Sequence, residues 1–267
     1  MIRVTSRSNP RLKEASRLVA SSRDRRKAGK CVLEGEHLVL AYARRYGEPE
    51  TLIVAEPLLE HASARKLIDD YGDRALVVPP TLFDDIASLP AGIGMLAVVV
   101  KPRPTPSRND RFCLLLDDVQ DPGNVGSMLR TAAAAGVSAA YLSAHCAFAW
   151  SPKVLRAGMG AHFHLDIHEH VDLVDWASAY RRRGGNVVAT VNEGGDDVHG
   201  ARLVAPIAVA IGNEGAGLSA ALIEAATMRV TIPMPGGTES LNAAASAAIV
   251  LYECVRRGVK EIAGQGN

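Results

Sequence analysis

Short apolar runs alternate with helical segments along most of the chain, and this alternation limits the possible folds more than any other feature. The run at 207–211, Ile-Ala-Val-Ala-Ile, is apolar throughout, which is typical of a strand in a sheet covered by helices on both faces. Strands that alternate with helices are joined by crossovers and lie parallel. The sequence therefore predicts an α/β fold built on largely parallel sheets.

The alternation falls into two blocks with a similar pattern. In the first block, strands are predicted at 31–35, 51–56, 75–78 and 95–100, with helices at 36–47, at 57–71 and after Pro80. In the second, strands are predicted at 112–119, 139–143, 162–167, 186–191, 206–212 and 228–234, with helices near 124–135, 152–158, 172–183, 217–226 and 240–257.

A proline-rich segment, residues 101–110, separates the two blocks. Its prolines occur at every second position from Pro102 to Pro106, which removes ladder donors and favours an extended connection. We therefore expect four parts: a basic N-terminal arm at 1–30, a small α/β domain at 31–100, a linker at 101–110 and a second α/β domain at 111–267.

The charge of the chain is concentrated at its N-terminus. Residues 1–30 contain ten Lys or Arg and two acids, a net charge of +8, although the whole chain has a net charge of +1. A basic segment on an acidic body is typical of proteins that bind a polyanion, most often nucleic acid. The candidate RNA-binding residues are Arg11, Arg25, Arg26 and Lys27. The alternative is a solvated helix that starts at Asn9-Pro10 and turns Leu12, Ala15 and Val19 inward.

Several classes of protein are disfavoured. The four cysteines form no CxxC pair, which favours free thiols in a reducing cytosol over a disulfide framework or a zinc knuckle. No apolar run approaches the roughly 20 residues of a membrane-spanning helix, and the first residues lack the apolar stretch of a secretory signal. We therefore expect a cytoplasmic protein with no membrane partner.

A histidine-rich segment suggests a metal site but does not require one. If 162–170 were one strand, alternate residues would share a face. They are His162, His164, Asp166, His168 and His170. Imidazoles on one face could bind a transition metal. The solvated face of an edge strand is the simpler interpretation, and we expect no metal.

Ligands of open α/β sheets bind beyond the carboxyl ends of the strands. Three segments at the carboxyl ends of predicted strands are rich in glycine and polar residues: 117–132, 211–219 and 232–245. No GxxxxGK[ST] or GxSxG pattern is present, which disfavours P-loop and nucleophile-elbow chemistry. Residues 215–220 match a loose GxGxxA pattern, but the end of the next strand has no carboxylate for a dinucleotide ribose, so NAD binding is disfavoured.

Together, the three segments resemble the SpoU/TrmH-type RNA 2′-O-ribose methyltransferases of the SPOUT class. The residues that carry the resemblance are Asn124, Gly126 and Arg130; Ile211, Gly212, Glu214 and Gly217; and Ile232, Pro233, Met234, Ser240, Leu241 and Asn242, followed by Val250-Leu251-Tyr252-Glu253. Residues 31–100 also resemble the family's small N-terminal RNA-binding domain.

The resemblance implies a C-terminal α/β domain with a deep trefoil knot, whose loops bind S-adenosylmethionine, in a homodimer with each site at the subunit interface. The cofactor contacts that it implies are Thr190, Gly212, Gly217, Ile232 and Leu241. For Ile232 and Leu241, ordinary core packing is the alternative. Where the family commonly has SLNVS, this chain has Ala243-Ala244 after Asn242, which could alter the cofactor pocket or the dimer contact.

The resemblance also implies a catalytic set, which consists of Arg130, Asn124, Glu214, Ser240 and Asn242. The family assigns its motif arginine the role of base. Because an arginine pKa above about 12 leaves almost no neutral form at pH 7, a charged Arg130 that clamps an RNA phosphate and stabilises alkoxide charge is the alternative. Glu214 is expected to brace the loops, and the role of a catalytic base is the less favoured alternative. Helix capping is an alternative role for Asn124, Ser240 and Asn242.

The function that follows is S-adenosylmethionine-dependent methylation of a ribose 2′-hydroxyl in RNA. Ribosomal RNA (23S) is favoured over transfer RNA as the substrate. The alternative is a non-catalytic RNA-binding protein that keeps the fold.

Overall fold

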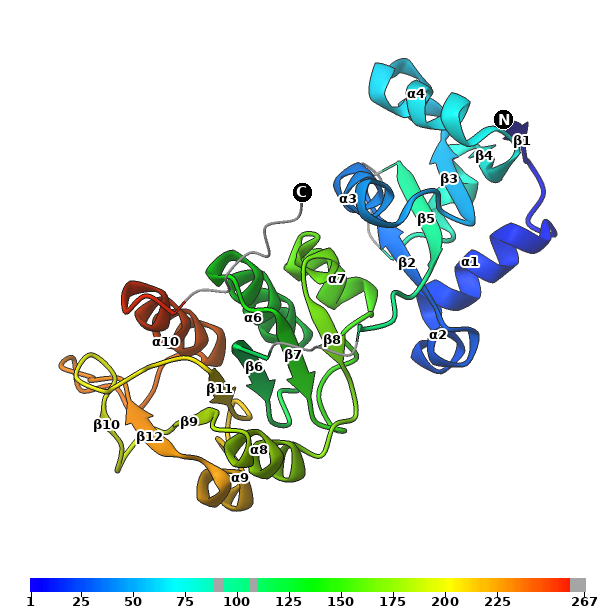
Figure 1. The fold of residues 1–267 in the computed structure, drawn as a ribbon. Helices are drawn as coiled ribbons and strands as arrows, with labels where there is room; N and C mark the ends of the chain where they lie inside the picture. The colour runs from blue at the N-terminus through cyan, green and yellow to red at the C-terminus, as the bar shows by residue number, and fades with distance from the viewer. Residues whose placement is uncertain (89–93, 106–109, 260–267) are drawn as a thin grey trace. The chain divides into compact units, whose positions relative to one another are not determined.

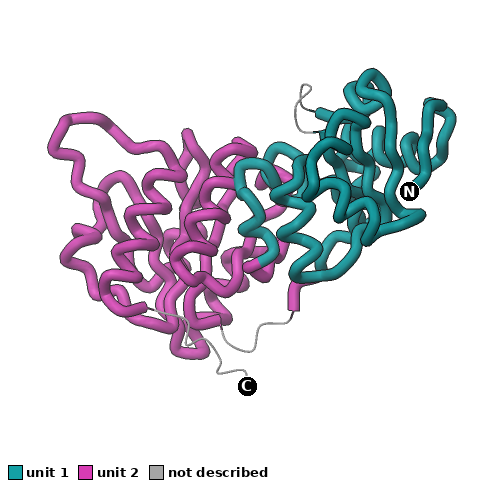
Figure 2. The backbone as a smooth tube through the Cα atoms, turned by 90° about the horizontal axis from the view of Figure 1, so that it is seen from above, with its two compact units in different colours: residues 1–102, 150–163 teal, residues 103–149, 164–267 magenta. Residues whose placement is uncertain are grey.

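The computed structural model describes residues 1–88, 94–105 and 110–259 (Figure 1). The chain divides into two compact units (Figure 2). The first consists of residues 1–102 and 150–163, and the second of residues 103–149 and 164–267. The division lies within the expected linker at 101–110, of which residues 106–109 are outside the described residues.

The first unit is a five-stranded sheet with helices. Its elements are β1 (Ile2–Arg3), α1 (Pro10–Ala20), α2 (Ser22–Ala28), β2 (Lys30–Glu34), α3 (Glu36–Tyr46), β3 (Thr51–Ala55), η1 (Glu56–Glu60), α4 (Ala62–Tyr71), η2 (Gly72–Arg74), β4 (Ala75–Val78), α5 (Pro80–Asp84), β5 (Met95–Val100), α7 (Pro152–Gly158) and η3 (Ala161–Phe163). The strand order is β1-β4-β3-β5-β2.

The sheet of the first unit is mixed, which corrects the expectation of a largely parallel one. Strands β1, β4 and β3 run parallel, whereas β5 pairs antiparallel with both β3 and β2. The alternation of strands and helices along the chain does not determine strand direction. Strand β5 lies between two strands that precede it in sequence, and it can pair antiparallel with them because an antiparallel pair needs no helical crossover.

The basic N-terminal segment is part of this unit and not a separate arm. Asn9 accepts hydrogen bonds from the backbone of Arg11 and Leu12 and so begins α1, with Pro10 in the first turn, as the sequence suggested. The buried face of α1 is formed by Leu12, Ala15 and Leu18, which join the core of the unit, while Val19 is only partly buried. Burial of this apolar stripe holds the segment on the domain.

Residues 150–163 also differ from the expected division, because they belong to the first unit. Helix α7 contacts β2. The Phe163 ring lies edge-on to the Tyr42 ring, with 5.7 Å between the centroids. A contact between segments more than a hundred residues apart leaves no local pattern in the sequence.

The second unit contains the predicted parallel sheet. Its elements are β6 (Phe112–Leu116), α6 (Pro122–Ala135), β7 (Ala139–Leu142), β8 (Asp166–His168), α8 (Leu173–Arg182), β9 (Asn186–Thr190), β10 (Asp196–Asp197), β11 (Ile207–Ile211), α9 (Ala220–Ala225), β12 (Met228–Thr231) and α10 (Ala243–Arg256). The strand order is β10-β12-β9-β11-β6-β7-β8, and every neighbouring pair is parallel.

Helices cover both faces of the sheet in the second unit, as the apolar strands predicted (Figure 1). Leu173 and Ala177 of α8 and Leu222 of α9 share a buried cluster with Leu115 and Ala208 from the central strands β6 and β11. Helices α6 and α10 pack against each other, and α10 contacts β11. Because the faces are closed, a ligand must bind at an edge of the sheet.

The histidine-rich segment does not form one strand. Ala161–Phe163 is the 3-10 helix η3, and only Asp166–His168 pairs in the sheet, as β8. His162 is fully buried beside the Trp150 ring, and His168 stacks on Tyr141. The five residues therefore do not share a face. In the described part of the chain, no three His, Cys, Asp or Glu side chains are placed to hold a metal.

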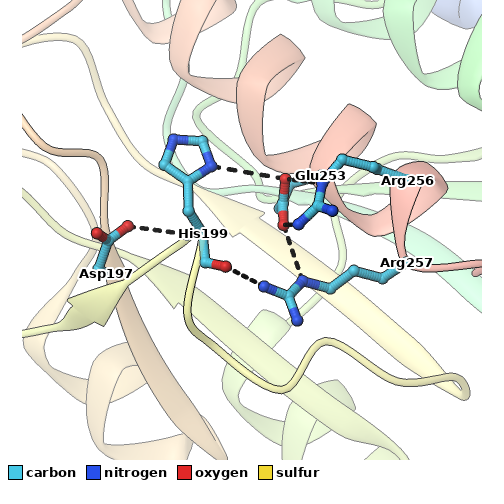
Figure 3. Close-up of polar contacts among 5 residues, drawn as sticks. All are labelled: Asp197, His199, Glu253, Arg256 and Arg257. Atoms are coloured by element: carbon cyan, nitrogen blue, oxygen red, sulfur yellow. Dashed lines mark hydrogen bonds and ion pairs between the residues drawn. The ribbon is translucent and has the colours of Figure 1, made fainter.

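A charged network joins the end of α10 to the loop before β11 (Figure 3). The buried Glu253 carboxylate accepts hydrogen bonds from Arg256 at 2.6 and 2.9 Å and from Arg257 at 2.8 Å, and lies 3.5 Å from His199. Arg257 also donates to the His199 carbonyl oxygen. The Arg256 contacts lower the pKa of Glu253 to about 2 against the effect of burial. The network therefore stabilises the fold above pH 4.5 and loses this contribution as the pH falls toward 2.

Within the described ranges, no helix is long and apolar enough to cross a bilayer. None of the four cysteines, all of which lie in the described part of the chain, forms a disulfide, and Cys31, Cys113 and Cys254 are buried.

Candidate active site

The three predicted loop segments meet at one edge of the second unit's sheet. They follow β6, β11 and β12, which are parallel strands, so their carboxyl ends lie at the same edge. The Asn213 side chain donates a hydrogen bond to the Asp118 carbonyl oxygen at 2.9 Å, and the backbone N–H of Ser219 donates to Asp117 at 2.9 Å. These contacts join the loop after β6 to the loop after β11.

Glu214 is the centre of this loop cluster. Its carboxylate accepts hydrogen bonds from the backbone N–H groups of Gln120 and Asp121, at 3.2 and 3.0 Å, and from the Asn124 side chain at 3.0 Å. One carboxylate therefore fixes the turn that leads into α6, as the bracing role predicts.

Asn124 connects this turn to the third segment. Its side-chain oxygen accepts a hydrogen bond from the Asn242 side chain at 3.0 Å, across 118 positions of sequence. Asn242 also accepts from the backbone of Ala244 and Ala245, so it caps α10 and positions Asn124 at the same time. Asn124 is not a cap: Asp121 caps α6 by accepting from the Asn124 backbone at 2.7 Å. Because Asp121 holds the cap position, the Asn124 amide is left for the loop cluster.

Two glycines let the loop after β11 fold back on itself. Asn213 and Gly217 exchange backbone hydrogen bonds at 2.9 and 3.0 Å, and Gly217 has a φ of +70°. A Cβ built on Gly212 would lie 2.1 Å from the carbonyl carbon of Gly217. Only a residue without a side chain fits at position 212, because the backbone of Gly217 and Leu218 fills the place of a Cβ.

A pocket opens beside this turn. Its lining residues are Thr190, Asn192, Ile211, Gly212, Asn213, Glu214, Gly215, Gly217, Ser240, Leu241, Ala243 and Ser246. Five of these are candidate site residues besides Glu214: Thr190, Gly212, Gly217, Ser240 and Leu241. Asn192 and Asn213 were missed, although both follow a predicted strand by one or two positions, which is the signal that could have found them.

Four candidate residues lie outside the pocket lining: Asn124 and Asn242, which belong to the cluster around Glu214, and also Ile232 and Arg130. Ile232 is only 7% exposed, which agrees with the alternative of core packing. Arg130 lies on the exposed side of α6, and within the described residues it forms no hydrogen bond or ion pair. The chain therefore does not join Arg130 to the cluster around Glu214.

The candidate RNA-binding residues belong to the first unit. Arg25 is the one that must be corrected: it is 5% exposed, and its guanidinium donates to the carbonyl oxygens of Leu18 and Val19, where α1 ends. A buried cation that satisfies helix carbonyls is not available to a phosphate. Arg11 is half-buried and donates to the Asp73 carbonyl oxygen at 2.6 Å. Arg26 and Lys27 are exposed.

Replacing Glu214 with glutamine is expected to weaken the cluster without unfolding the protein. Burial raises the pKa of Glu214, but the hydrogen bonds from Asn124 and the two backbone amides outweigh it and leave the pKa below its usual value. Glutamine keeps the shape but offers one acceptor oxygen, so we expect ligand affinity to fall about tenfold, or roughly 1.4 kcal/mol. In the wild type, the support that the Glu214 carboxylate gives to ligand affinity should be lost only below the ordinary carboxyl pKa, where Glu214 takes up a proton.

This prediction is checked by measuring ligand affinity at neutral pH and at a pH below the ordinary carboxyl pKa. Glu224→Gln, on α9, is the matched control and should leave the affinity unchanged. Equal affinity of Glu214→Gln and wild type would show that Glu214 does not support the pocket.

A parallel sheet with a glycine-lined pocket at the carboxyl ends of its strands defines an α/β protein that binds a small ligand at that edge. Comparison with known proteins identifies the family within this class. The chain belongs to the SpoU rRNA Methylase family, whose model matches residues 111–252.

Similar proteins cover almost the whole chain. It is 31% identical over 252 residues to the 23S rRNA (guanosine(2553)-2′-O)-methyltransferase RlmP of Bacillus subtilis, covering 94% of this chain and 98% of that protein. It is also 31% identical to the 23S rRNA (uridine(2479)-2′-O)-methyltransferase of Streptomyces viridochromogenes, covering 96% and 93%. The solved structure of the SpoU methyltransferase AviRb from Streptomyces viridochromogenes, in complex with AdoMet, matches with a TM-score of 0.82 at 30% identity, covering 94% and 99%. The resemblance inferred from the three motifs is thereby confirmed.

Proposed function

We propose that the cluster around Glu214 and the pocket beside it are the methyl-transfer site of an RNA 2′-O-ribose methyltransferase. The chain is an S-adenosylmethionine-dependent enzyme of this kind, acting on ribosomal RNA, as its family and its relatives support. The observation that carries the assignment of the site is the joining of three distant segments by the carboxylate of Glu214 and the amide of Asn124.

The pocket residues fit the cofactor. The Thr190 hydroxyl is buried and has no hydrogen-bond partner within the described residues, so it is ready for a polar ligand atom. Gly212 lines the pocket and lets the turn beside it close, and Leu241, 38% exposed, offers an apolar surface to a flat ring. S-adenosylmethionine supplies an electrophilic methyl group on a positively charged sulfur. Asn124 and Asn242 would orient groups around it.

Arg130 is the proposed catalytic residue. A guanidinium stays protonated at neutral pH, so we favour the charged role over that of a base. In this role Arg130 holds the RNA phosphate beside the target ribose and stabilises negative charge on the 2′-oxygen. Its exposed position on α6 leaves the whole fork of donors available.

We further propose that the enzyme is a homodimer with each site completed by the partner subunit. One chain offers a cavity of about 60 Å³, whereas small-molecule sites usually span roughly 300–1,000 Å³. The outer side of α10 and the residues before it include Leu241 and Tyr252, 38% and 50% exposed. An apolar face beside a small pocket supports an interface there, and Arg130 would then act on the partner's cofactor.

The knot and the role of the first unit belong to the same proposal. The proposed trefoil knot lies in the second unit, where Arg257 donates to the His199 carbonyl oxygen and holds the end of α10 against that loop (Figure 3). Residues 1–100 would bind the RNA, and residues 111–267 would form the catalytic domain. We also propose that the enzyme is cytoplasmic, with no metal and no membrane partner; its cysteines form no disulfide, which fits a reducing compartment.

Calorimetry with S-adenosylmethionine and S-adenosylhomocysteine, with light scattering for mass, tests this proposal. We expect both ligands to bind at one per chain, and a mass twice that of the 28.3 kDa chain. Binding of neither ligand by a correctly folded dimer would favour the non-catalytic RNA-binding protein.

A further inference from the structure

A second cavity lies in the first unit, between helices α1 and α5, far along the chain from the cofactor pocket. It is a groove of about 490 Å³, within the usual size range of a small-molecule site. Its lining residues are Arg7, Leu12, Lys13, Ser16, Arg17, Ala20, Leu82, Asp85 and Ile86. Nothing derived above for methyl transfer uses this groove.

The groove has an apolar floor and a cationic rim. The floor consists of Leu12, Leu82 and Ile86, each at most 6% exposed and part of the core of the unit. These side chains hold the groove open on a rigid base. A flat, partly apolar ligand would cover the remaining apolar surface.

The rim of the groove has a net positive charge. Arg7 pairs with Asp85 at 2.5 Å, and both are exposed. Lys13 and Arg17 are exposed one turn apart on α1 and form no ion pair within the described residues. Three cations and one acid leave the rim with a net charge of +2, on a segment whose net charge is +8 over residues 1–30. The complementary ligand is anionic at its edges and apolar in its plane.

We propose that this groove binds one unpaired nucleotide of the RNA substrate, with its base on the apolar floor and its flanking phosphates at Lys13 and Arg17. The proposal rests on the proposed function for its choice of RNA. A base in a duplex is stacked and paired, so it cannot enter a groove, whereas an unpaired base in a loop or bulge can. The groove thus selects single-stranded segments, while the charged rim alone would bind any RNA.

Two variants separate the groove from its charge. Ser16→Trp fills the groove without changing charge, and we expect it to weaken binding of a short single-stranded oligouridine about tenfold while leaving binding of an equally long duplex unchanged. Lys13→Gln/Arg17→Gln should weaken the binding of both RNAs. It should also reduce the slope of log affinity against log salt concentration by about two, because two phosphate contacts are lost. Arg65→Gln/Lys66→Gln, on α4, removes the same charge elsewhere and should do neither.

Fluorescence anisotropy at several salt concentrations measures these affinities on the full chain, and calorimetry of S-adenosylmethionine is run in parallel. Single-stranded binding by Ser16→Trp equal to that of wild type would overturn the proposal. If that variant fails to fold, an unchanged single-strand affinity of Lys13→Gln/Arg17→Gln overturns it equally. A wild type that prefers the single strand but does not bind S-adenosylmethionine would contradict the proposed function and leave the groove standing.

Discussion

Replacing Gly212 with alanine is expected to weaken cofactor binding strongly. The added Cβ would lie 2.1 Å from the carbonyl carbon of Gly217 and 2.2 Å from the backbone nitrogen of Leu218, and backbone atoms cannot rotate away. The turn must open and lose the paired hydrogen bonds between Asn213 and Gly217. Overpacking of this kind costs up to about 3 kcal/mol, which corresponds to a loss of affinity of up to roughly 100-fold.

Gly200→Ala is the matched control, because it adds the same methyl group outside the pocket lining. Its Cβ would have no neighbour closer than the Asp197 carbonyl oxygen, at 3.6 Å. Calorimetry with S-adenosylmethionine compares the two variants, and thermal melting shows whether each is folded. Wild-type affinity in Gly212→Ala would mean that this turn is not part of the cofactor pocket.

Replacing Arg130 with lysine is expected to remove methyl transfer and leave cofactor affinity unchanged. Lysine keeps the charge but not the planar fork that holds a phosphate with two bonds. The loss should fall on the rate of transfer, by about 100-fold to 1,000-fold, as for removal of a donor that stabilises an oxyanion. Single-turnover transfer of a labelled methyl group to RNA measures it, with Arg182→Lys on α8 as the control.

The position of Arg130 allows a sharper test with mixed dimers. If Arg130 acts on the partner's site, a heterodimer of Arg130→Ala and Gly212→Ala chains contains one complete site and regains about half of the wild-type activity. If Arg130 serves its own chain, both sites of the heterodimer are broken. Activity near zero in the mixed dimer would contradict the shared site while leaving the role of Arg130 in place.

Sequence patterns predicted most of the long elements because burial imposes them locally. The apolar strands β6, β9 and β11, and the helices α6 and α10, follow from periodicity, and the start of α10 also follows from the possible cap at Asn242. The two-residue strands β1 and β10 were not predicted, because a segment that short has no periodicity. The direction of β5 was also not predictable, since pairing partners are chosen in space.

The candidate site shows the same limit. Motif order predicted that Asn124, Glu214 and Asn242 would lie together, and their hydrogen bonds confirm it. The geometry assigned two roles that the sequence could not assign. Asp121 is the cap of α6, and Ile232 lies outside the pocket lining. Arg25 could not be distinguished from its exposed neighbours, because its burial depends on the way α2 folds back on the end of α1.

The most direct test of the whole account is the chemical identity of the modified nucleotide. Purified protein is incubated with ribosomal RNA and S-adenosylmethionine carrying a labelled methyl group, and the RNA is digested to nucleosides and separated. The account predicts that the label appears in a 2′-O-methylated nucleoside and is absent when Arg130→Lys replaces the wild type. Label in a base-methylated nucleoside, or no label with a protein that binds both ligands, would contradict it.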